Sequence, residues 1–463
     1  MKQTLRYICC ACFLLCYLFS VAQTNQWREI YKVKRKDTLF GIAKKFDLAI
    51  PDLMEANPDM KKQGYELKKG EYVFIPFSKD VLEARAKADA EAKAKAEAAK
   101  ALAEQQADDV RKRAIRVGIM LPLHDIDGDG RRMVEYYRGV LLACDSLKRQ
   151  GISTNIHAWN VPITADIRQT LLENGAKECD IIFGPLYTKQ VKALGDFCRT
   201  YQIKMVIPFS ISSDEVEHNP QIFQVYQSPE EQSQQAIKAF IERFPNHHLV
   251  LIDCNDTTSK KGIFTFNLRK EIESQGKTYN ITNLKSSEIY FAKAFSEKQP
   301  NIVVLNTGRS PELNMALAKL NTLKINMPAL SISLFGYTEW LMYAKVYQNL
   351  FHKYNTYIPT NFYYNPTSQE VKHLEQNYQR WFHTTMQNAL PRFAITGYDQ
   401  AQFFLRGLHE YGKEFKGLRS QNEYKPLQTT LNFKPANEQG GMRNRHFMLI
   451  HYKTDQAIEA VNY

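Results

Sequence analysis

The stretch Asp180-Ile181-Ile182-Phe183-Gly184-Pro185-Leu186 decides how most of the chain is expected to fold. An apolar run between an acid and a Gly-Pro turn is typical of a strand buried on both faces of a sheet. A helical pattern over 191–201 follows, and 204–208 predicts the next strand. Strands that alternate with helices favour a parallel sheet covered by helices.

The same alternation extends over 115–463 and starts afresh once, near residue 230. Two successive α/β series predict two lobes. Before the deciding stretch, the pattern predicts a strand at 116–121, a helix at 133–149, a strand at 155–160 and a helix at 167–178; after the restart it predicts a helix at 230–244, a strand at 248–253, a helix at 264–275 and a strand at 301–306.

Three further motifs follow residues 180–186 along the chain, and their order is typical of a known family. They are Ile207-Pro208-Phe209-Ser210, the segment 219–232 with Asn219-Pro220 and Ser228-Pro229, and Ile395-Thr396-Gly397-Tyr398-Asp399. Together these motifs resemble the type 1 periplasmic-binding-protein family, in its branched-chain amino-acid receptor branch. The resemblance implies two Rossmann-like lobes with a ligand between them, at the carboxyl ends of the strands.

The family's three crossings between lobes are expected near residues 225, 358 and 430. Lobe 1 would then comprise about 115–225 and 358–430, and lobe 2 about 226–357 and 431–463. Asp399 is expected to fix a helix start rather than touch a ligand.

A ligand carboxylate would suit a helix N-terminus and small hydroxyl groups, because exposed N–H groups and the helix dipole favour an anion. The family also often uses a Tyr-Gly pair after the first strand of the second lobe, and the segment 255–262 has no Tyr. Loop and capping roles remain an alternative for the serines. The expected cleft residues are Pro185, Leu186, Tyr187, Thr188, Ser210, Ser212 and Ser213.

A separate small domain is predicted over 27–78, with the order strand, helix, helix, strand. Its motifs are Tyr31-x-Val33, Asp37-Thr38-Leu39, Asn57-Pro58 and Val73-x-Ile75-Pro76. They resemble a LysM module, a family that binds N-acetylglucosamine glycans, including peptidoglycan, between two loops. Lys36 stands where the family usually has glycine, and helix capping by Asp37, Thr38 and Asn57 is the alternative role. The glycan-binding residues implied are Asp37, Thr38, Leu39, Phe40, Asn57, Pro58, Asp59 and Met60.

Residues 79–114 are rich in Ala, Lys and Glu and lack Gly and Pro. These residue types are the strongest helix formers, so the segment predicts a helical linker. Its few apolar residues favour a solitary helix over the alternative, a coiled-coil dimer.

Residues 1–22 predict a signal peptide. Lys2 and Arg6 precede an apolar run over 7–19, and small residues end at Ala22. An uncleaved anchor is the alternative. The expected location is therefore the periplasm or cell envelope. The net charge of +12 is spread along the chain, which favours anionic wall polymers and not nucleic acid.

No motif in the sequence predicts catalysis, a cofactor or a metal centre. Outside 1–22, the cysteines have no zinc-ligand spacing, and a disulfide or buried free thiols are both open. Asp125, Asp127 and Asp129 begin like an EF-hand loop, but its twelfth position is Tyr136, so calcium binding and a solvated turn both remain open. The remaining cysteines are Cys144, Cys179, Cys198 and Cys254.

These features predict a non-catalytic, peptidoglycan-associated protein with a LysM anchor and a bilobed domain. That domain would bind an amino-acid-like or muropeptide ligand, or a peptidoglycan synthase, as its resemblance to some penicillin-binding-protein activators implies. The alternatives are a substrate-binding receptor for an amino acid or peptide transporter, and a structural scaffold with an empty cleft.

Overall fold

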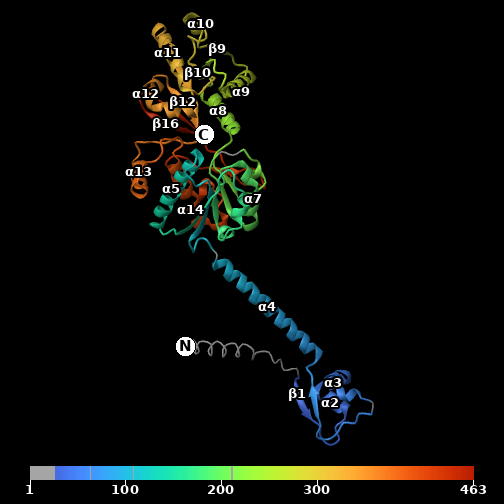
Figure 1. The fold of residues 1–463 in the computed structure, drawn as a ribbon. Coiled ribbons are helices and arrows are strands. Elements are labelled where there is room, and N and C mark those ends of the chain that lie inside the picture. Colours follow the sequence, from blue (N-terminus) through green and yellow to red (C-terminus); the bar gives the residue numbers. More distant parts are fainter. Residues whose placement is uncertain (1–26, 63, 108, 210–211) are drawn as a thin grey trace. The chain divides into compact units, whose positions relative to one another are not determined.

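The computed structural model describes residues 27–62, 64–107, 109–209 and 212–463 (Figure 1). The signal peptide predicted over 1–22 lies outside the described residues. The chain divides into two compact units, Met1–Ala107 and Asp108–Tyr463. No helix of the described part is both long and apolar enough to cross a membrane.

The first unit contains a two-stranded antiparallel sheet in which β1 (Glu29–Lys32) pairs with β2 (Tyr72–Ile75). Between the strands lie α2 (Leu39–Phe46), α3 (Ile50–Ala56) and a 3-10 helix (Pro58–Lys61). Alternate strand residues such as Tyr31 and Val73 point inward and meet Leu53 in a buried core. The predicted order of strand, helix, helix and strand is confirmed.

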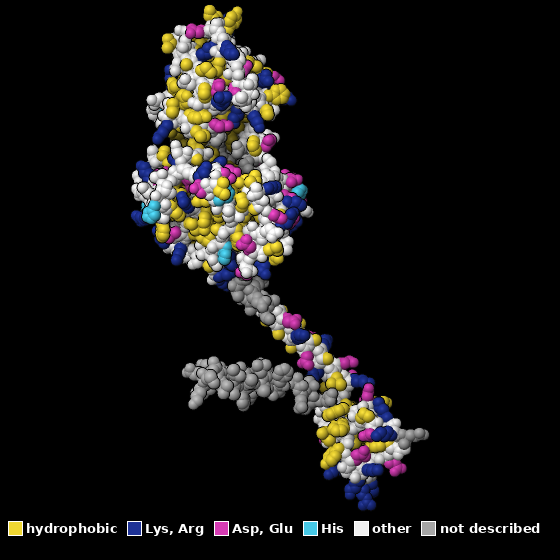
Figure 2. Space-filling view, viewed as in Figure 1, with side chains coloured by type: hydrophobic (Ala, Val, Ile, Leu, Met, Phe, Trp, Pro, Cys, Tyr) yellow, Lys and Arg dark blue, Asp and Glu magenta, His cyan; other side chains and the backbone are white. Residues whose placement is uncertain are grey.

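The helix α4 (Lys79–Ala107) follows, and its 29 residues span about 44 Å at a rise of ~1.5 Å per residue. Side chains over 79–99 are exposed, and basic and acidic groups intermix along them (Figure 2). Lys79 pairs with Asp52 of α3 at 2.9 Å, which fixes the start of α4 to the small domain. A helix that buries no face over 79–99 is typical of a spacer. The helix α4 ends at Ala107, earlier than the end predicted for the helical linker, residue 114.

The first lobe of the second unit is built on a seven-stranded sheet in the order β13-β14-β7-β6-β5-β3-β4. The strands are parallel except β13, which runs antiparallel to β14. The central strands are almost wholly buried because helices cover both faces of the sheet. The bounds are β3 Ile115–Leu121, β4 Thr154–Asn160, β5 Ile181–Phe183, β6 Lys204–Ile207, β7 Ile222–Gln224, β13 Phe433–Pro435 and β14 Met442–Asn444.

Five helices accompany this sheet, and two of them, α5 and α14, lie side by side (Figure 1). Gly139 of α5 and Gly397 of α14 permit this close approach. A Cβ on Gly397 would fall 2.1 Å from the Tyr136 carbonyl oxygen, and one on Gly139 would fall 1.9 Å from that of Ala394. The helix bounds are α5 Gly128–Lys148, α6 Ile167–Leu171, α7 Thr188–Tyr201, α13 Gln369–Phe382 and α14 Phe393–Tyr411.

The second lobe repeats the plan with the strand order β16-β15-β12-β11-β10-β8-β9. The five strands β8 to β12 are parallel to one another. β15 runs antiparallel to β12, and β16 runs antiparallel to β15. The bounds are α8 Pro229–Arg243, β8 His248–Asp253, α9 Lys261–Ser274, β9 Tyr279–Asn283, α10 Glu288–Ala292, β10 Asn301–Leu305, α11 Ser310–Asn326, β11 Ile332–Phe335, α12 Ala344–Lys353, β12 Thr356–Thr360, β15 Met448–Tyr452 and β16 Ile458–Asn462.

In each lobe the first five strands along the chain follow the spatial order second, first, third, fourth, fifth. Strand order reverses between β3 and β5 in the first lobe, and between β8 and β10 in the second. Ligands of open α/β sheets bind beyond the carboxyl ends of the strands at such reversals. The predicted fold class, a small βααβ module, a helical spacer and a two-lobed α/β domain, is confirmed.

Two sequence expectations need correction. The third crossing between lobes lies between β14 and β15, not near 430, because β14 pairs with β7 of the first lobe, Met442 facing Phe223. Residues 431–444 therefore carry strands of the first lobe. The helix predicted over 167–178 is also interrupted: α6 ends at Leu171, and Gly175 has a φ of 89° in a turn.

Candidate functional site

The first predicted glycan loop of the small domain is held by its own polar residues. Asp37 Oδ2 accepts a hydrogen bond from the Lys34 backbone N–H at 2.7 Å and from Tyr31 Oη at 3.0 Å. The backbone hydrogen bond from Lys34 lowers the pKa of Asp37. Thr38 Oγ1 accepts from the Gly41 N–H at 3.0 Å and caps α2. The polar side chains of this loop therefore fix its backbone.

The second predicted loop is anchored from inside the domain. Asn57 is buried, and its Nδ2 donates to the carbonyl oxygens of Leu53 at 2.8 Å and Phe74 at 2.7 Å, while its Oδ1 accepts from the Phe74 N–H at 2.8 Å. Met60 is buried in the same core against which Leu39 of the first loop packs. One core thus holds both loops.

The exposed members of the predicted glycan set are Thr38, Phe40, Pro58 and Asp59. Phe40 is 64% exposed in the first turn of α2. Pro58 is exposed, and Asp59 forms an ion pair with Lys62. The apolar surface that these two loops offer a sugar therefore depends on Phe40 and Pro58.

An exposed apolar face on the outer side of β1 and β2 was not predicted. Ile30 lies opposite Phe74 across the strands, and Tyr72 is 59% exposed beside them. Trp27 packs against Phe74 with ring centroids 5.3 Å apart. The signal was present in the sequence, because the outward positions Ile30, Tyr72 and Phe74 are apolar as well as the inward ones, Lys32 being the exception.

In the first lobe, the predicted cleft segment 185–188 lies at the carboxyl end of β5. A Cβ on Gly184 would fall 2.2 Å from the Met120 carbonyl oxygen, so this loop passes tightly against β3. Tyr187 Oη donates to Asp129 Oδ2 at 3.3 Å, and burial raises the pKa of Tyr187 to about 12. Pro185 is buried, Leu186 packs on the lobe core and Thr188 starts α7.

The predicted serines lie further from β5. Ser210 is outside the described residues. Ser212 and Ser213 line a shallow depression of about 460 Å³ that also includes Glu230 and Arg443. Since Glu230 belongs to α8, this depression joins residues of both lobes. The structure therefore places the predicted residues 185–188 and 212–213 at separate positions on the carboxyl edge of the first lobe.

Asp399 does not start a helix, contrary to the sequence expectation. It lies inside α14, fully buried, and its carboxylate accepts hydrogen bonds from Tyr424 Oη at 2.8 Å and from the backbone N–H groups of 427–429. Burial raises the pKa of Asp399 to about 6 against these four donors. Asp399 holds the segment 424–429 against α14, and Gly397 beside it provides the contact with α5.

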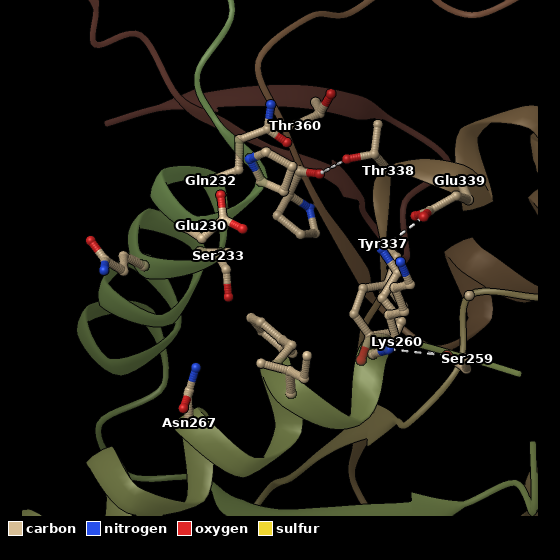
Figure 3. A pocket seen from close by; sticks show the side chains of 18 of the residues that line it. Glu230, Gln232, Ser233, Ser259, Lys260, Asn267, Tyr337, Thr338, Glu339 and Thr360 are labelled. Carbon is tan, nitrogen blue, oxygen red and sulfur yellow. Dashed lines mark hydrogen bonds and ion pairs between the residues drawn. The ribbon is translucent and has the colours of Figure 1, made fainter. Parts of the chain in front are cut away.

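A larger cavity of about 710 Å³ lies on the second lobe, at the reversal between β8 and β10 (Figure 3). Figure 3 shows Glu230 and Ser233 of α8 on one side of the open space and Tyr337 and Glu339 on the other. Further lining residues are Gln232, Thr258, Ser259, Lys260, Lys261, Ile263, Phe264, Asn267, Gly308, Arg309, Thr338, Thr360 and Phe447.

The floor of this cavity is held by contacts between its loops. Asp256 accepts hydrogen bonds from Thr258 and from Thr307 Oγ1, which lower the pKa of its carboxyl to about 2. Lys261 pairs with Glu339 at 2.7 Å, and its Nζ lies 4.8 Å from the centre of the Tyr337 ring. The cavity thus combines fixed polar groups with aromatic surface, which is the composition of a small-molecule site.

The sequence did not predict the residues that line this cavity, although the segment 255–262 was considered as a ligand-binding segment. Its residues come from α8, from α9, from the segments that follow β8, β10 and β11, from the end of β12 and from Phe447, so they meet only in the folded lobe. Tyr337, which follows β11, adds an aromatic side chain to this cavity, whereas the segment 255–262 after β8 has no Tyr. The pair Gly336-Tyr337, directly after the buried strand β11, was the sequence signal that could have predicted this cavity.

In the described part of the chain, no cluster of three or more His, Cys, Asp or Glu is suited to a metal ion. Asp127 caps α5 by accepting from the Gly130 N–H at 2.8 Å, and Asp129 pairs with Arg132 at 3.3 Å. Each of these EF-hand-like acids therefore has a local structural partner.

The four described cysteines are buried and free, so no disulfide joins them. Burial raises the pKa of Cys144 to about 11 and that of Cys254 to about 12. Such thiols stay protonated at neutral pH and are poor nucleophiles.

Comparison with known proteins identifies both parts of the chain. The LysM domain family matches residues 31–76, so the first unit contains a LysM domain. No curated protein matches the chain.

Among solved structures, a branched-chain amino acid ABC transporter protein from Rhodospirillum rubrum is similar at a TM-score of 0.52 and 14% identity, covering 75% of this chain and 100% of that chain. LivJ from Streptococcus pneumoniae, solved with isoleucine, has a TM-score of 0.42 at 12% identity, covering 76% and 100%. The likeness to the R. rubrum protein shows that the second unit has the type 1 periplasmic-binding-protein fold.

Proposed function

We propose that the chain is a non-catalytic, exported protein of the cell envelope. Its LysM domain binds the N-acetylglucosamine glycan of peptidoglycan, and its two-lobed domain binds a wall-derived ligand or a wall-synthesis partner. The observation that carries the proposal is the combination itself: a LysM domain joined through a 29-residue helix, exposed over residues 79–99, to a domain with a cavity of about 710 Å³.

The glycan part rests on the two loops that the LysM core holds in place. Backbone groups there are fixed by Asp37, Thr38 and Asn57, and Phe40 stays exposed to cover a sugar face. Fixed backbone donors with a nearby apolar surface suit an acetamido sugar, because little conformational entropy is lost on binding.

Pelleting of the full chain with insoluble peptidoglycan tests this part. Phe40→Ala should reduce the pelleted fraction at least fivefold. Tyr72→Ala is the matched control, since Tyr72 is a similarly exposed aromatic on the outer face of the sheet. No pelleting above a protein without LysM, or an equal loss with both variants, would contradict the assignment of these loops.

The ligand part rests on the cavity of the second lobe, with its aromatic wall and fixed polar floor. Thermal unfolding of the full chain with muropeptides, short peptides and free amino acids tests it. A ligand at ~100 times its Kd adds about 2.7 kcal/mol to the native state, and for a unit of this size that is a shift of about 4 °C.

A cavity-filling variant makes the ligand test specific. Ser233→Arg on α8 should abolish the shift, whereas Lys238→Arg, an exposed position of the same helix, should keep it. Shifts that survive Ser233→Arg would place the ligand elsewhere. If no ligand shifts the unfolding temperature and a peptidoglycan synthase co-purifies with the chain, the result would support binding of a wall-synthesis partner.

A second candidate is a substrate-binding receptor for an amino acid or peptide transporter. The fold shared with the R. rubrum transporter protein favours it. A shift with free amino acids and none with muropeptides would support this candidate over the first.

A further inference from the structure

A second cavity of about 540 Å³ lies at the opposite edge of the first lobe's sheet, where β5, β6, β7 and β14 begin. Ligands of this fold class bind at the carboxyl edge of the sheet, so the fold itself gives the amino edge no role. Its apolar wall contains Val110, Phe223, Leu408, Phe415, Pro435 and Met442.

Lys204, the first residue of β6, is the charged group at the centre of this wall. Its side chain is half-buried, and its Nζ lies 5.5 Å from the centre of the Phe223 ring. Nζ donates one hydrogen bond, to the Lys413 carbonyl oxygen at 3.2 Å. No carboxylate among the described residues forms an ion pair with Lys204, and burial lowers the pKa of its amine to about 8.

Three carboxylates line the cavity, those of Glu178, Asp180 and Glu438, and that of Asp180 is already neutralised by other residues. Asp180 pairs with Arg113 at 2.7 Å and with Arg116 at 3.2 Å, and it accepts the Arg116 backbone N–H at 2.8 Å. Lys177, Lys413 and Lys416 add positive charge around the opening. The cavity therefore has a positive interior with an apolar surface beside it.

An ammonium group that is removed from water without a counter-ion lowers stability, and an incoming anion would compensate its charge. Phosphate is favoured by arginine forks and clusters of backbone N–H groups. A single lysine beside phenylalanine rings suits a carboxylate on an apolar body instead. We propose that this cavity binds an organic monocarboxylate, with the carboxylate at Lys204 and the apolar part against Phe223 and Phe415.

Calorimetric titration of the full chain with hexanoate tests the proposal, with neutral hexanamide and inorganic phosphate as comparison probes. Hexanoate should bind, and hexanamide and phosphate should bind at least tenfold more weakly. An acetylated dipeptide with a free carboxyl terminus distinguishes the two sources of this chemistry, a small acid and a peptide end. Equal binding of hexanamide, or binding of phosphate alone, would overturn the proposal.

Two lysine variants locate the carboxylate. Lys204→Met keeps the apolar stem and should weaken hexanoate at least tenfold, whereas Lys148→Met, at an exposed position of α5, should stay within twofold. Ser233→Arg, which fills the cavity of the second lobe, should leave hexanoate binding intact. Unchanged binding to Lys204→Met, or loss of binding in Ser233→Arg, would assign hexanoate to another site.

The pH dependence gives an independent readout. Because Lys204 loses its proton near pH 8, hexanoate affinity should fall about tenfold from pH 7 to pH 9, while exposed lysines keep their charge. Affinity that is constant over this range would refute the role of Lys204. The other charged or titratable groups that face Lys204 or line the cavity are Arg116, Lys177, Glu178, Cys179, Asp180, Tyr201, Lys413, Glu414, Lys416 and Glu438.

Discussion

Replacing Lys204 by Met should make the second unit more stable at neutral pH. Burial lowers the pKa of Lys204 from 10.5 to about 8, and each pH unit corresponds to 1.36 kcal/mol. The charged amine is therefore about 3 kcal/mol less favourable in the folded unit than in the unfolded chain. The variant also loses a hydrogen bond to the Lys413 carbonyl oxygen, which contributes about 1 kcal/mol. The expected net gain at pH 7 is about 2 kcal/mol.

The sign of the pH dependence follows from proton counting. Between pH 8 and 10.5 the unfolded chain holds a proton on Lys204 that the folded unit has released. The free energy of unfolding of the parent protein therefore rises with pH in this window, and the Met variant lacks this contribution. The advantage of Lys204→Met should be fully present below pH 8 and should shrink toward pH 10.5.

Urea unfolding of the full chain, followed by tryptophan fluorescence, measures this difference. Trp159 and Trp340 are buried in the second unit and report its unfolding. Lys148→Met is the control, because that exposed lysine should change stability by less than 0.5 kcal/mol. A loss of more than 1 kcal/mol at pH 7, or a difference that stays constant up to pH 10.5, would refute the reasoning.

Three other substitutions test local features by urea or thermal unfolding. Gly397→Ala should destabilise the second unit by about 3 kcal/mol because its Cβ would meet the Tyr136 carbonyl at 2.1 Å, whereas Gly262→Ala, with open space around it, should be neutral or stabilising. Lys36→Gly should stabilise the LysM domain by about 0.5–1 kcal/mol, since Lys36 has a φ of 81°; a loss of stability would contradict this. Asn57→Ala should destabilise the LysM domain by about 3 kcal/mol, because the buried backbone N–H and C=O of Phe74 each lose a hydrogen bond to the Asn57 side chain. A change below 1 kcal/mol would argue against a structural role for Asn57.

The LysM domain could be predicted nearly to the residue because its signals are local. Thr38 caps a helix through a hydrogen bond to Gly41, three residues away, and the inward positions of β1 and β2 alternate with period two. Lys36 is instructive in the same way: the position where the family usually has glycine does adopt a left-handed backbone here. A local conformational requirement is readable from sequence even when the residue departs from the preferred type.

The third crossing between lobes could not be placed for the opposite reason. β13 and β14 are three residues each, and β14 pairs with a strand about 220 residues earlier, Met442 facing Phe223. Strands so short carry no periodic signal, and their sheet is chosen by distant partners. The two cavities follow the same rule. Lys204 has the position of an ordinary strand start, and it lines a cavity only because residues 413–416 and the β13–β14 turn, distant in the sequence, line the same cavity.

The tether changes the affinity that the second unit needs. If the LysM domain holds the chain on glycan, the second unit can reach other groups of the same polymer over the length of α4. Binding of the second unit to such a group is then effectively intramolecular. Effective concentrations in such linked systems are in the millimolar range for short linkers. A site with Kd near 1 mM would then be substantially occupied on the wall and nearly empty in dilute solution. We therefore expect soluble wall fragments to bind the cavity of the second lobe weakly, and to bind far better when the glycan that LysM recognises is covalently joined to them.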